Sequence, residues 1–158
     1  ACDACRGAGE TETQKTLKVS IPAGIDAGQS IRVPQQGQPG RRGGPTGHLY
    51  VAVDLEDDPR FTRDGVDLIH ELHVSFTQAA LGATIDVETI DGSKVAVAVP
   101  AGTQPGETIS VAGHGVPRLD GRGRGRMVCV VQIAVPKNLS AKAKKLLLEL
   151  QETFETER

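Results

Sequence analysis

Short runs of alternating hydrophobic and polar residues recur along most of the chain, and this alternation predicts β-strands. Leu17, Val19 and Ile21 alternate with polar neighbours, so their side chains share one face of an extended segment. Pro22 ends that segment, because proline donates no hydrogen bond to a β-ladder. Glycine- and proline-rich loops separate it from the next strands. Those further strands are expected at residues 31–33 and 49–53.

The same pattern occurs a second time, 78 residues later. Residues 19–53 align without a gap on residues 97–131, and 12 of the 35 paired positions are identical. Ordinary residue usage would give roughly 2 or 3 identities by chance. Both copies contain the sequence Pro-Ala-Gly, at residues 22–24 and 100–102. The repeat predicts two tandem modules that share one arrangement of strands.

The second copy is preceded by alternating segments that the first copy lacks. These segments cover residues 66–76 and 84–89, and one helical turn is expected between them at Thr77–Gly82. Asp91-Gly92 then fits a tight hairpin turn. In the first copy, the counterparts of these segments would fall at or before the first residues of the chain. We therefore expect a fragment of a longer protein whose first module is incomplete.

The last part of the chain follows a helical pattern instead. Ser140 can cap a helix that runs to about residue 156. Ala143, Leu147, Leu150 and Phe154 recur at helical spacing and form one apolar stripe. Lysines near the start of this helix and glutamates near its end oppose the macrodipole, so the helix is marginal alone. It must pack against a second copy or against its own module.

These patterns predict a mainly β fold, with two tandem, small β-sandwich-like modules and a C-terminal α-helix. Composition is consistent with aliphatic cores, since only four of the 158 residues are Phe or Tyr and none is Trp. The net charge of −2 provides no general attraction for nucleic acid. No apolar run approaches the roughly 20 residues that a helix needs to span a bilayer, so a membrane partner is not expected.

Cys2 and Cys5 belong to a CxxCxGxG motif. Two thiolates at this spacing suit tetrahedral zinc, but zinc takes four ligands, so the pair is half a site. A redox pair is the alternative, although such a pair usually opens a helix rather than preceding glycines. Cys129 lies within an apolar strand and is expected to be a buried, unreactive thiol.

The remaining polar motifs do not form a recognisable catalytic constellation. His70 and His73 are three residues apart in a strand, which places them on opposite faces. The arginine- and glycine-rich segment 118–126 has no aromatic residues to stack on bases, so we interpret it as a solvated loop and consider nucleic acid an unlikely partner. No nucleophile stands beside a His in a recognisable frame, which favours a binding module over an enzyme.

The CxxCxGxG motif resembles the zinc repeats of the DnaJ-type (type I) J-domain co-chaperones. The resemblance continues through the P-A-G-x-x-x-G segments, Gly47–Val51, residues 61–68, Ala79–Gly82 and the Asn138-Leu139-Ser140 segment. Three of the family's four cysteine repeats, its J-domain and its Gly/Phe-rich linker are absent from this chain. By this resemblance, the chain runs from the last zinc repeat through two C-terminal β-domains to a dimerisation helix. The implied divisions are residues 1–10, 11–58, 59–136 and 137–158.

The resemblance implies a cytoplasmic, non-enzymatic region that holds exposed apolar segments of unfolded clients and passes them to a DnaK-type heat-shock ATPase. The implied site residues are Leu17, Val19, Ile31 and Val51 for clients, Cys2 and Cys5 for zinc, and Ala143, Leu147, Leu150 and Phe154 for a homodimer. Leu17 and Val51 match the family's client pocket best. Ordinary core remains the alternative for all four client residues. Two other functions stay open: a thiol oxidoreductase or isomerase using the CxxC pair, and a structural β-repeat without clients.

Overall fold

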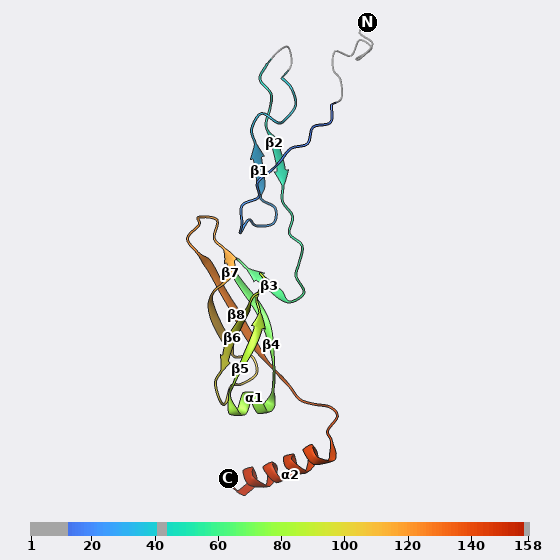
Figure 1. Ribbon diagram of the computed structural model, residues 1–158, viewed down its shortest axis with the longest axis vertical. Coiled ribbons are helices and arrows are strands. Elements are labelled where there is room, and N and C mark those ends of the chain that lie inside the picture. Colours follow the sequence, from blue (N-terminus) through green and yellow to red (C-terminus); the bar gives the residue numbers. More distant parts are fainter. Residues whose placement is uncertain (1–12, 41–43, 157–158) are drawn as a thin grey trace. The chain divides into compact units, whose positions relative to one another are not determined.

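The computed structural model describes residues 13–40 and 44–156. It divides into two compact units, residues 1–55 and 56–158 (Figure 1). Strands make up most of the regular structure and a helix closes the chain, which confirms the predicted mainly β fold.

In the first unit, β1 (Ser30–Val33) and β2 (Leu49–Ala52) form an antiparallel pair. Ile31 lies directly opposite Val51 in this pair. Beyond the strands, Val53 donates its backbone N–H to the carbonyl of Gln29 at 2.8 Å and so extends the pairing. This ladder is the only sheet among the described residues of the first unit.

The strand predicted at Leu17–Ile21 is wrong, because these residues have no regular structure. Their equivalents in the second copy belong to β6 (Lys94–Val99), which is held by an antiparallel partner, β5 (Ala83–Glu88). In the first copy, the positions equivalent to β5 are residues 5–10, which carry the cysteine and glycine motif instead of an alternating pattern. The alternation at residues 17–21 therefore has no strand to pair with in the described part of the chain.

The second unit contains a four-stranded sheet in the order β3-β4-β8-β7. Its strands are β3 (Phe61–Asp64), β4 (Asp67–Ser75), β7 (Thr108–Pro117) and β8 (Arg124–Ala134). The central strands β4 and β8 are parallel, and both outer pairs are antiparallel. The Asp91-Gly92 turn joins β5 to β6, as predicted.

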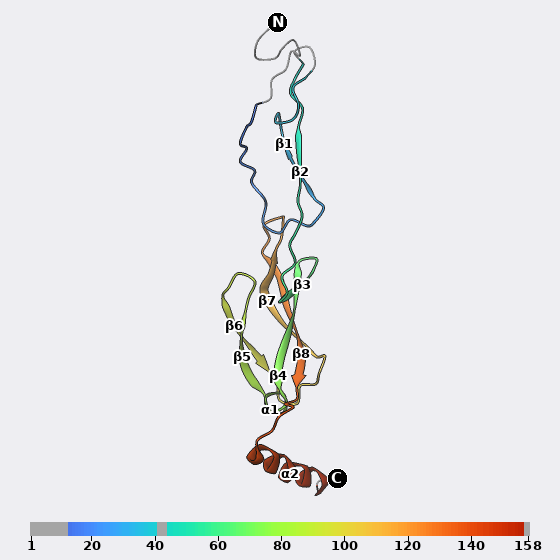
Figure 2. The ribbon, with the colours of Figure 1, turned by 90° about the vertical axis from the view of Figure 1, so that its right-hand side faces the viewer.

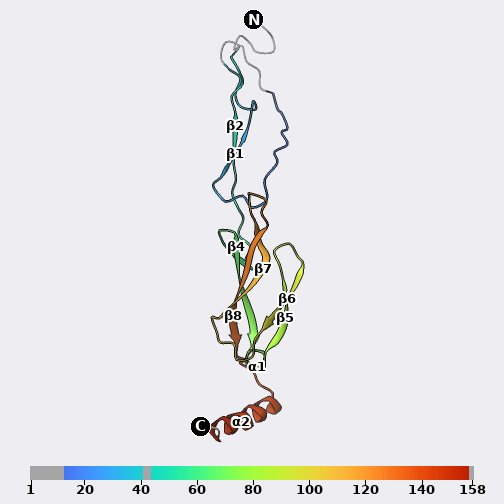
Figure 3. The ribbon, with the colours of Figure 1, turned by 90° about the vertical axis from the view of Figure 1, so that its left-hand side faces the viewer.

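The β5-β6 hairpin covers one face of the four-stranded sheet, which makes a small sandwich (Figures 2 and 3). The core lies between these layers. It contains Leu68, Leu72 and Val74 from β4, Met127, Cys129 and Val131 from β8, and Val87, Val97 and Val99 from the hairpin. Cys129 is fully buried, as predicted.

Helix α1 (Phe76–Leu81) follows β4 directly and confirms the predicted helical turn. Its start is fixed by a capping box, in which the Ser75 hydroxyl accepts from the backbone of Gln78 and the Gln78 side chain accepts from the backbone of Ser75. Helix α2 (Ala141–Thr156) begins at the predicted residue. Ser140 caps it, because its Oγ accepts the N–H of Ala143 at 3.2 Å.

The internal repeat is visible in the hydrogen-bond register. All four residue pairs of β1 and β2 recur in β7 and β8 when 78 is added to each number; for example, Ile31 opposite Val51 becomes Ile109 opposite Cys129. The two copies therefore share one strand arrangement wherever both are described.

Candidate functional site

One face of the β1-β2 pair carries two of the four predicted client residues, Ile31 and Val51. Ile31 and Val51 are cross-strand neighbours on this face and are joined there by the pair Val33 and Leu49. All four are half buried and alternate with more exposed neighbours, as expected for a sheet with one apolar face. We call this surface the unit-1 face.

Leu17 and Val19 precede the sheet in a segment without regular structure. Both are half buried, whereas Lys18 and Ser20 are exposed. The segment is tied to the loop after β1, because Lys15 donates from Nζ to Oε1 of Gln36 at 2.9 Å. The structure thus brings Ile31 and Val51 together as a pair and places Leu17 and Val19 outside the ladder.

The repeat shows what the unit-1 face corresponds to in a complete sandwich. Ile31 and Val51 are equivalent to Ile109 and Cys129, which face the β5-β6 hairpin in the second unit. In the first unit, no second layer lies among the described residues. This correspondence also fits the ordinary-core interpretation of the predicted client residues. The face is apolar and half open, so it is suited to receive a further apolar segment.

The free side of β2 is a second feature of this surface. Its counterpart β8 pairs with β7 on one side and with β4 on the other. β2 pairs with β1 alone among the residues that the structure describes. A strand edge of this kind presents backbone N–H and C=O groups that can pair with an extended polypeptide of any sequence.

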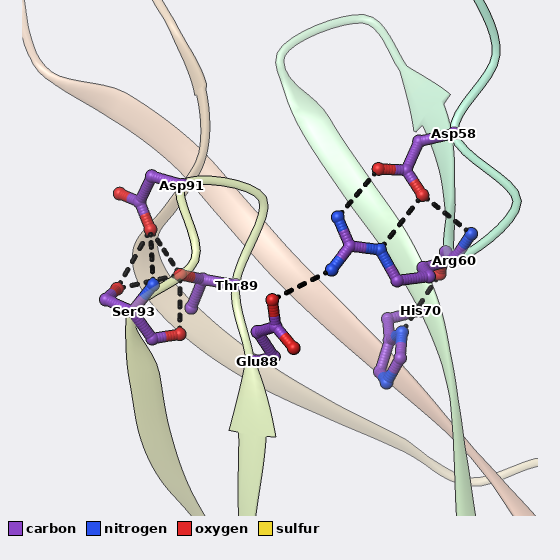
Figure 4. A network of polar contacts seen from close by, with 7 residues as sticks. All are labelled: Asp58, Arg60, His70, Glu88, Thr89, Asp91 and Ser93. Atoms are coloured by element: carbon purple, nitrogen blue, oxygen red, sulfur yellow. Dashed lines mark hydrogen bonds and ion pairs between the residues drawn. The ribbon is translucent and has the colours of Figure 1, made fainter.

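The second unit has a groove on the side of the four-stranded sheet opposite the core. Its volume is about 430 Å³, and Ile69 of β4 and Val130 of β8 line its apolar part. Thr62, Glu71 and His73 provide a polar rim. Arg60 also lines the groove. It bridges Asp58 at 2.9 Å and Glu88 at 3.1 Å (Figure 4).

The groove was not predicted from the sequence, although the apolar pattern of β8 indicates it. Residues 127–131 read Met-Val-Cys-Val-Val, a continuous apolar run without alternation. Such runs are typical of strands that are covered on both faces. Val128 and Val130 occupy the groove side of β8, and Ile69 lies directly beside Val128 on β4. We call these three residues the outer patch.

Charged groups of the second unit are tied into ion pairs around the sandwich. Arg126 contacts Asp67 at 3.0 Å, and Arg124 contacts Asp91 at 2.9 Å. The hydrogen bonds from Arg126 hold the pKa of Asp67 below its ordinary value. Two arginines of the glycine-rich segment are thereby paired with carboxylates rather than presented as an open basic surface.

Reactive chemistry has few candidates in the described residues. Burial raises the pKa of the Cys129 thiol, so this cysteine remains protonated and inert. His70 points inward and donates its Nδ1–H to the carbonyl of Arg60 at 2.9 Å, whereas His73 is exposed. No group of three His, Cys, Asp or Glu side chains is placed to hold a metal in residues 13–40 and 44–156. Cys2 and Cys5 lie outside the described residues.

Helix α2 leaves its predicted interface residues accessible. Phe154 is 60% exposed and Leu150 is 40% exposed, while Ala143 and Leu147 are half buried. No residue of the helix is buried. In the part of the chain that the structure describes, no helix is both long enough and apolar enough to cross a membrane.

Comparison with known proteins identifies the family to which this architecture belongs. The family described as the DnaJ C terminal domain matches residues 6–136. The chain is 48% identical over 165 aligned positions to the chaperone protein DnaJ of Ruminiclostridium cellulolyticum, covering 96% of this chain and 43% of that protein. Identity to chaperone protein DnaJ 1 of Corynebacterium diphtheriae is 44%, covering 96% of this chain and 40% of that protein. Identity to the chaperone protein DnaJ of Cereibacter sphaeroides is 42%, covering 98% of this chain and 40% of that protein.

The chain thus spans about two-fifths of the length of these relatives. Within that span, the match includes both copies of the internal repeat and the four-stranded sheet of the second unit. The chain belongs to the DnaJ C-terminal domain family and is similar to bacterial DnaJ chaperones along nearly all of its length.

Proposed function

We propose that this region holds exposed apolar segments of unfolded proteins, without catalysis, and presents them to a DnaK-type heat-shock ATPase in the cytoplasm. The chaperone names of its relatives support this role. The observation that carries the proposal is the unit-1 face, where Ile31 and Val51 form an apolar surface next to the free side of β2. Apolar side chains of a client would enter this face.

The backbone of the client adds the second part of the interaction. An extended segment that lies along the free side of β2 can form main-chain hydrogen bonds whatever its sequence. Apolar contacts with Val51 and its neighbours then select for hydrophobic side chains. This combination explains how one site binds many unrelated unfolded chains.

Two further roles belong to the proposal. Cys2 and Cys5 would provide half of a structural zinc site, whose other two ligands come from elsewhere. Helix α2 would join two copies through the stripe of Ala143, Leu147, Leu150 and Phe154, because this stripe is accessible and apolar. Two client sites in one dimer raise the avidity for a long unfolded chain.

Binding of a fluorescein-labelled, leucine-rich peptide, followed by fluorescence anisotropy, tests the client site. Val51→Asp places a carboxylate on the unit-1 face and should weaken binding at least tenfold. Ala52→Asp is the matched control, since Ala52 is the next residue of β2 and points to the opposite, exposed face. It should leave the affinity within about twofold, as expected for exposed sites.

Three results would contradict the proposal in different ways. Equal binding by Val51→Asp and the native chain would place the client site elsewhere. No binding and no suppression of light scattering from a denatured client would favour a structural β-repeat. Loss of activity in disulfide exchange after Cys2→Ser, with peptide binding unchanged, would favour the thiol oxidoreductase alternative.

A further inference from the structure

The outer patch is the apolar surface of the second unit that its own layers leave open. The β5-β6 hairpin covers the opposite face of the sheet, and Ile69, Val128 and Val130 form a half-buried row on this one. The apolar run Met127–Val131 of β8 is typical of a strand that is covered on both faces. A covering element of about the length of the sheet is therefore expected on the outer patch.

Helix α2 has the dimensions and the position in the chain to provide this cover. Its 16 residues extend about 24 Å, against about 30 Å for the nine residues of β4. The six residues between Ala134 and Ala141 can span about 20 Å. Because stacked layers lie about 10 Å apart, this tether is long enough to turn the helix back over the sheet.

The charges of the two surfaces match when the helix runs antiparallel to β8. Its lysine-rich start, with Lys142 and Lys144, would then enter over the Ser75–Ala134 end of the sheet, on the face where exposed Glu71 stands in the middle of β4. The glutamates of its second half, including Glu152, would lie near Arg122 and Arg126, whose side chains are 86% and 61% exposed although each also contacts an aspartate. The reverse direction would bring like charges together.

We propose that α2 is a strap that closes over the outer patch of its own chain, in competition with its proposed role in the dimer. The inference rests on that proposed role, because both contacts use the stripe of Leu147, Leu150 and Phe154. A short tether gives an effective concentration on the order of millimolar. The strap therefore closes in dilute protein and is displaced when a second copy offers its own stripe.

Paramagnetic relaxation enhancement in the full chain tests the strap. A nitroxide is attached at Gln151→Cys, beside the stripe, in a background with Cys2→Ser and Cys5→Ser. Cys129 is fully buried and remains unlabelled. In dilute samples, the amide signals of Ile69 and Val130 should lose intensity, and those of β5 and β6 on the far side of the sheet should not.

Two substitutions make the result specific. Val130→Lys places a charge in the outer patch and should restore the lost intensity. Ala98→Lys, an exposed position of β6, is the matched control and should leave the effect unchanged. A mixed sample combines chains that carry the nitroxide but no ¹⁵N with ¹⁵N chains that carry no nitroxide. Any broadening in this sample comes from contacts between copies, and none is expected at the outer patch.

Several outcomes would overturn the strap. These are undiminished signals at the outer patch, broadening that survives Val130→Lys, or broadening that occurs only in the mixed sample, which would show docking on a second copy. Failure of the dimer proposal has a separate signature, a monomeric mass at high concentration. Broadening of the outer patch in such a monomer would still support the strap.

Discussion

Gly106 donates its backbone N–H to the carbonyl oxygen of Val131 at 2.8 Å. The equivalent bond in the first copy, from Gly28 to Val53, measures 2.9 Å. Both glycines have positive φ, at +84° and +78°. The loop that leads into each β-pair is therefore built in the same way in both units, although a covering layer is seen only in the second unit among the residues that the structure describes.

Valine in place of Gly102 should destabilise the second unit by more than about 1 kcal/mol. Gly102 has φ +82°, where side chains are strained, although no atom would obstruct its Cβ. Gly24 has φ +90°, so Gly24→Val should weaken the first unit in the same way. Urea denaturation measures the free energy of unfolding, with Ala101→Val as the control. Unchanged midpoints in both glycine variants would reject the shared turn.

Gly125→Ala should lower the free energy of unfolding more than Gly102→Val does, because the new side chain would overlap with the backbone. A Cβ at Gly125 would lie 1.9 Å from the carbonyl oxygen of Val66. The backbone must shift to relieve this overlap, and a loss of roughly 3 kcal/mol or more is expected. Gly113→Ala is the matched control, since Gly113 has φ +77° and open space around it. Equal losses in the two variants would show that the close approach to Val66 is unimportant.

Asp67 should make the second unit sensitive to acid. Its hydrogen bonds with Arg126 lower the pKa of the folded-state carboxylate from 3.8. Since the folded-state pKa is depressed, the stabilisation is complete above the unfolded-state pKa and is lost as the pH falls through the folded-state value. Urea midpoints at pH 6 and pH 2.5 should therefore differ less in Asp67→Asn than in the native chain. Arg126→Gln should reduce the same difference, and an unchanged difference in both variants would contradict the assignment.

Removal of residues 137–158 should convert the proposed dimer into a monomer. Burying two leucines and a phenylalanine stabilises by roughly 1.5–3 kcal/mol each, part of which offsets the cost of ordering and association. Sedimentation equilibrium gives the mass of both chains. Leu150→Asp should act like the truncation, and Gln151→Asp, its neighbour beside the stripe, should not. A dimer that survives truncation would place the interface elsewhere.

The chain as it stands should bind zinc poorly. Two cysteines provide half of the four ligands, and the affinity of structural sites depends on all of them. Metal analysis after exhaustive dialysis should find less than one zinc per chain. A full equivalent per chain would contradict this expectation. Half an equivalent would indicate two chains sharing one ion through Cys2 and Cys5.

Local patterns predicted much of the second unit because its residues find their partners within the chain. The alternation of residues 66–76 and 84–89, the Asp91-Gly92 turn and the cap at Ser140 all appear where expected. The strand predicted at Leu17–Ile21 is not formed, and no partner strand for it lies among the described residues. A strand exists only when a neighbour completes its hydrogen bonds, and alternation in one segment carries no information about that neighbour.

The prediction of the apolar surfaces was also limited by which strands lie side by side. The pairing of Ile31 with Val51 follows from the shared register of the repeat, which the gap-free alignment already implied. The outer patch was not predicted because it depends on Ile69 lying beside Val128, a parallel contact between segments 59 positions apart. Sequence periodicity indicates which face of a strand is apolar but not which strand stands next to it.

The parallel pairing of β4 with β8 sets the order in which the second unit can fold during synthesis. Its contacts span 59 residues, as between Asp67 and Arg126, which gives this sheet a high contact order. At 5–20 residues per second, a ribosome needs roughly 3 to 12 seconds to make β8 after β4. Throughout that interval, β4 lacks its central neighbour, while the local β5-β6 hairpin can already close. A chaperone domain built in this way passes through the exposed, unpaired state that chaperones protect in other proteins.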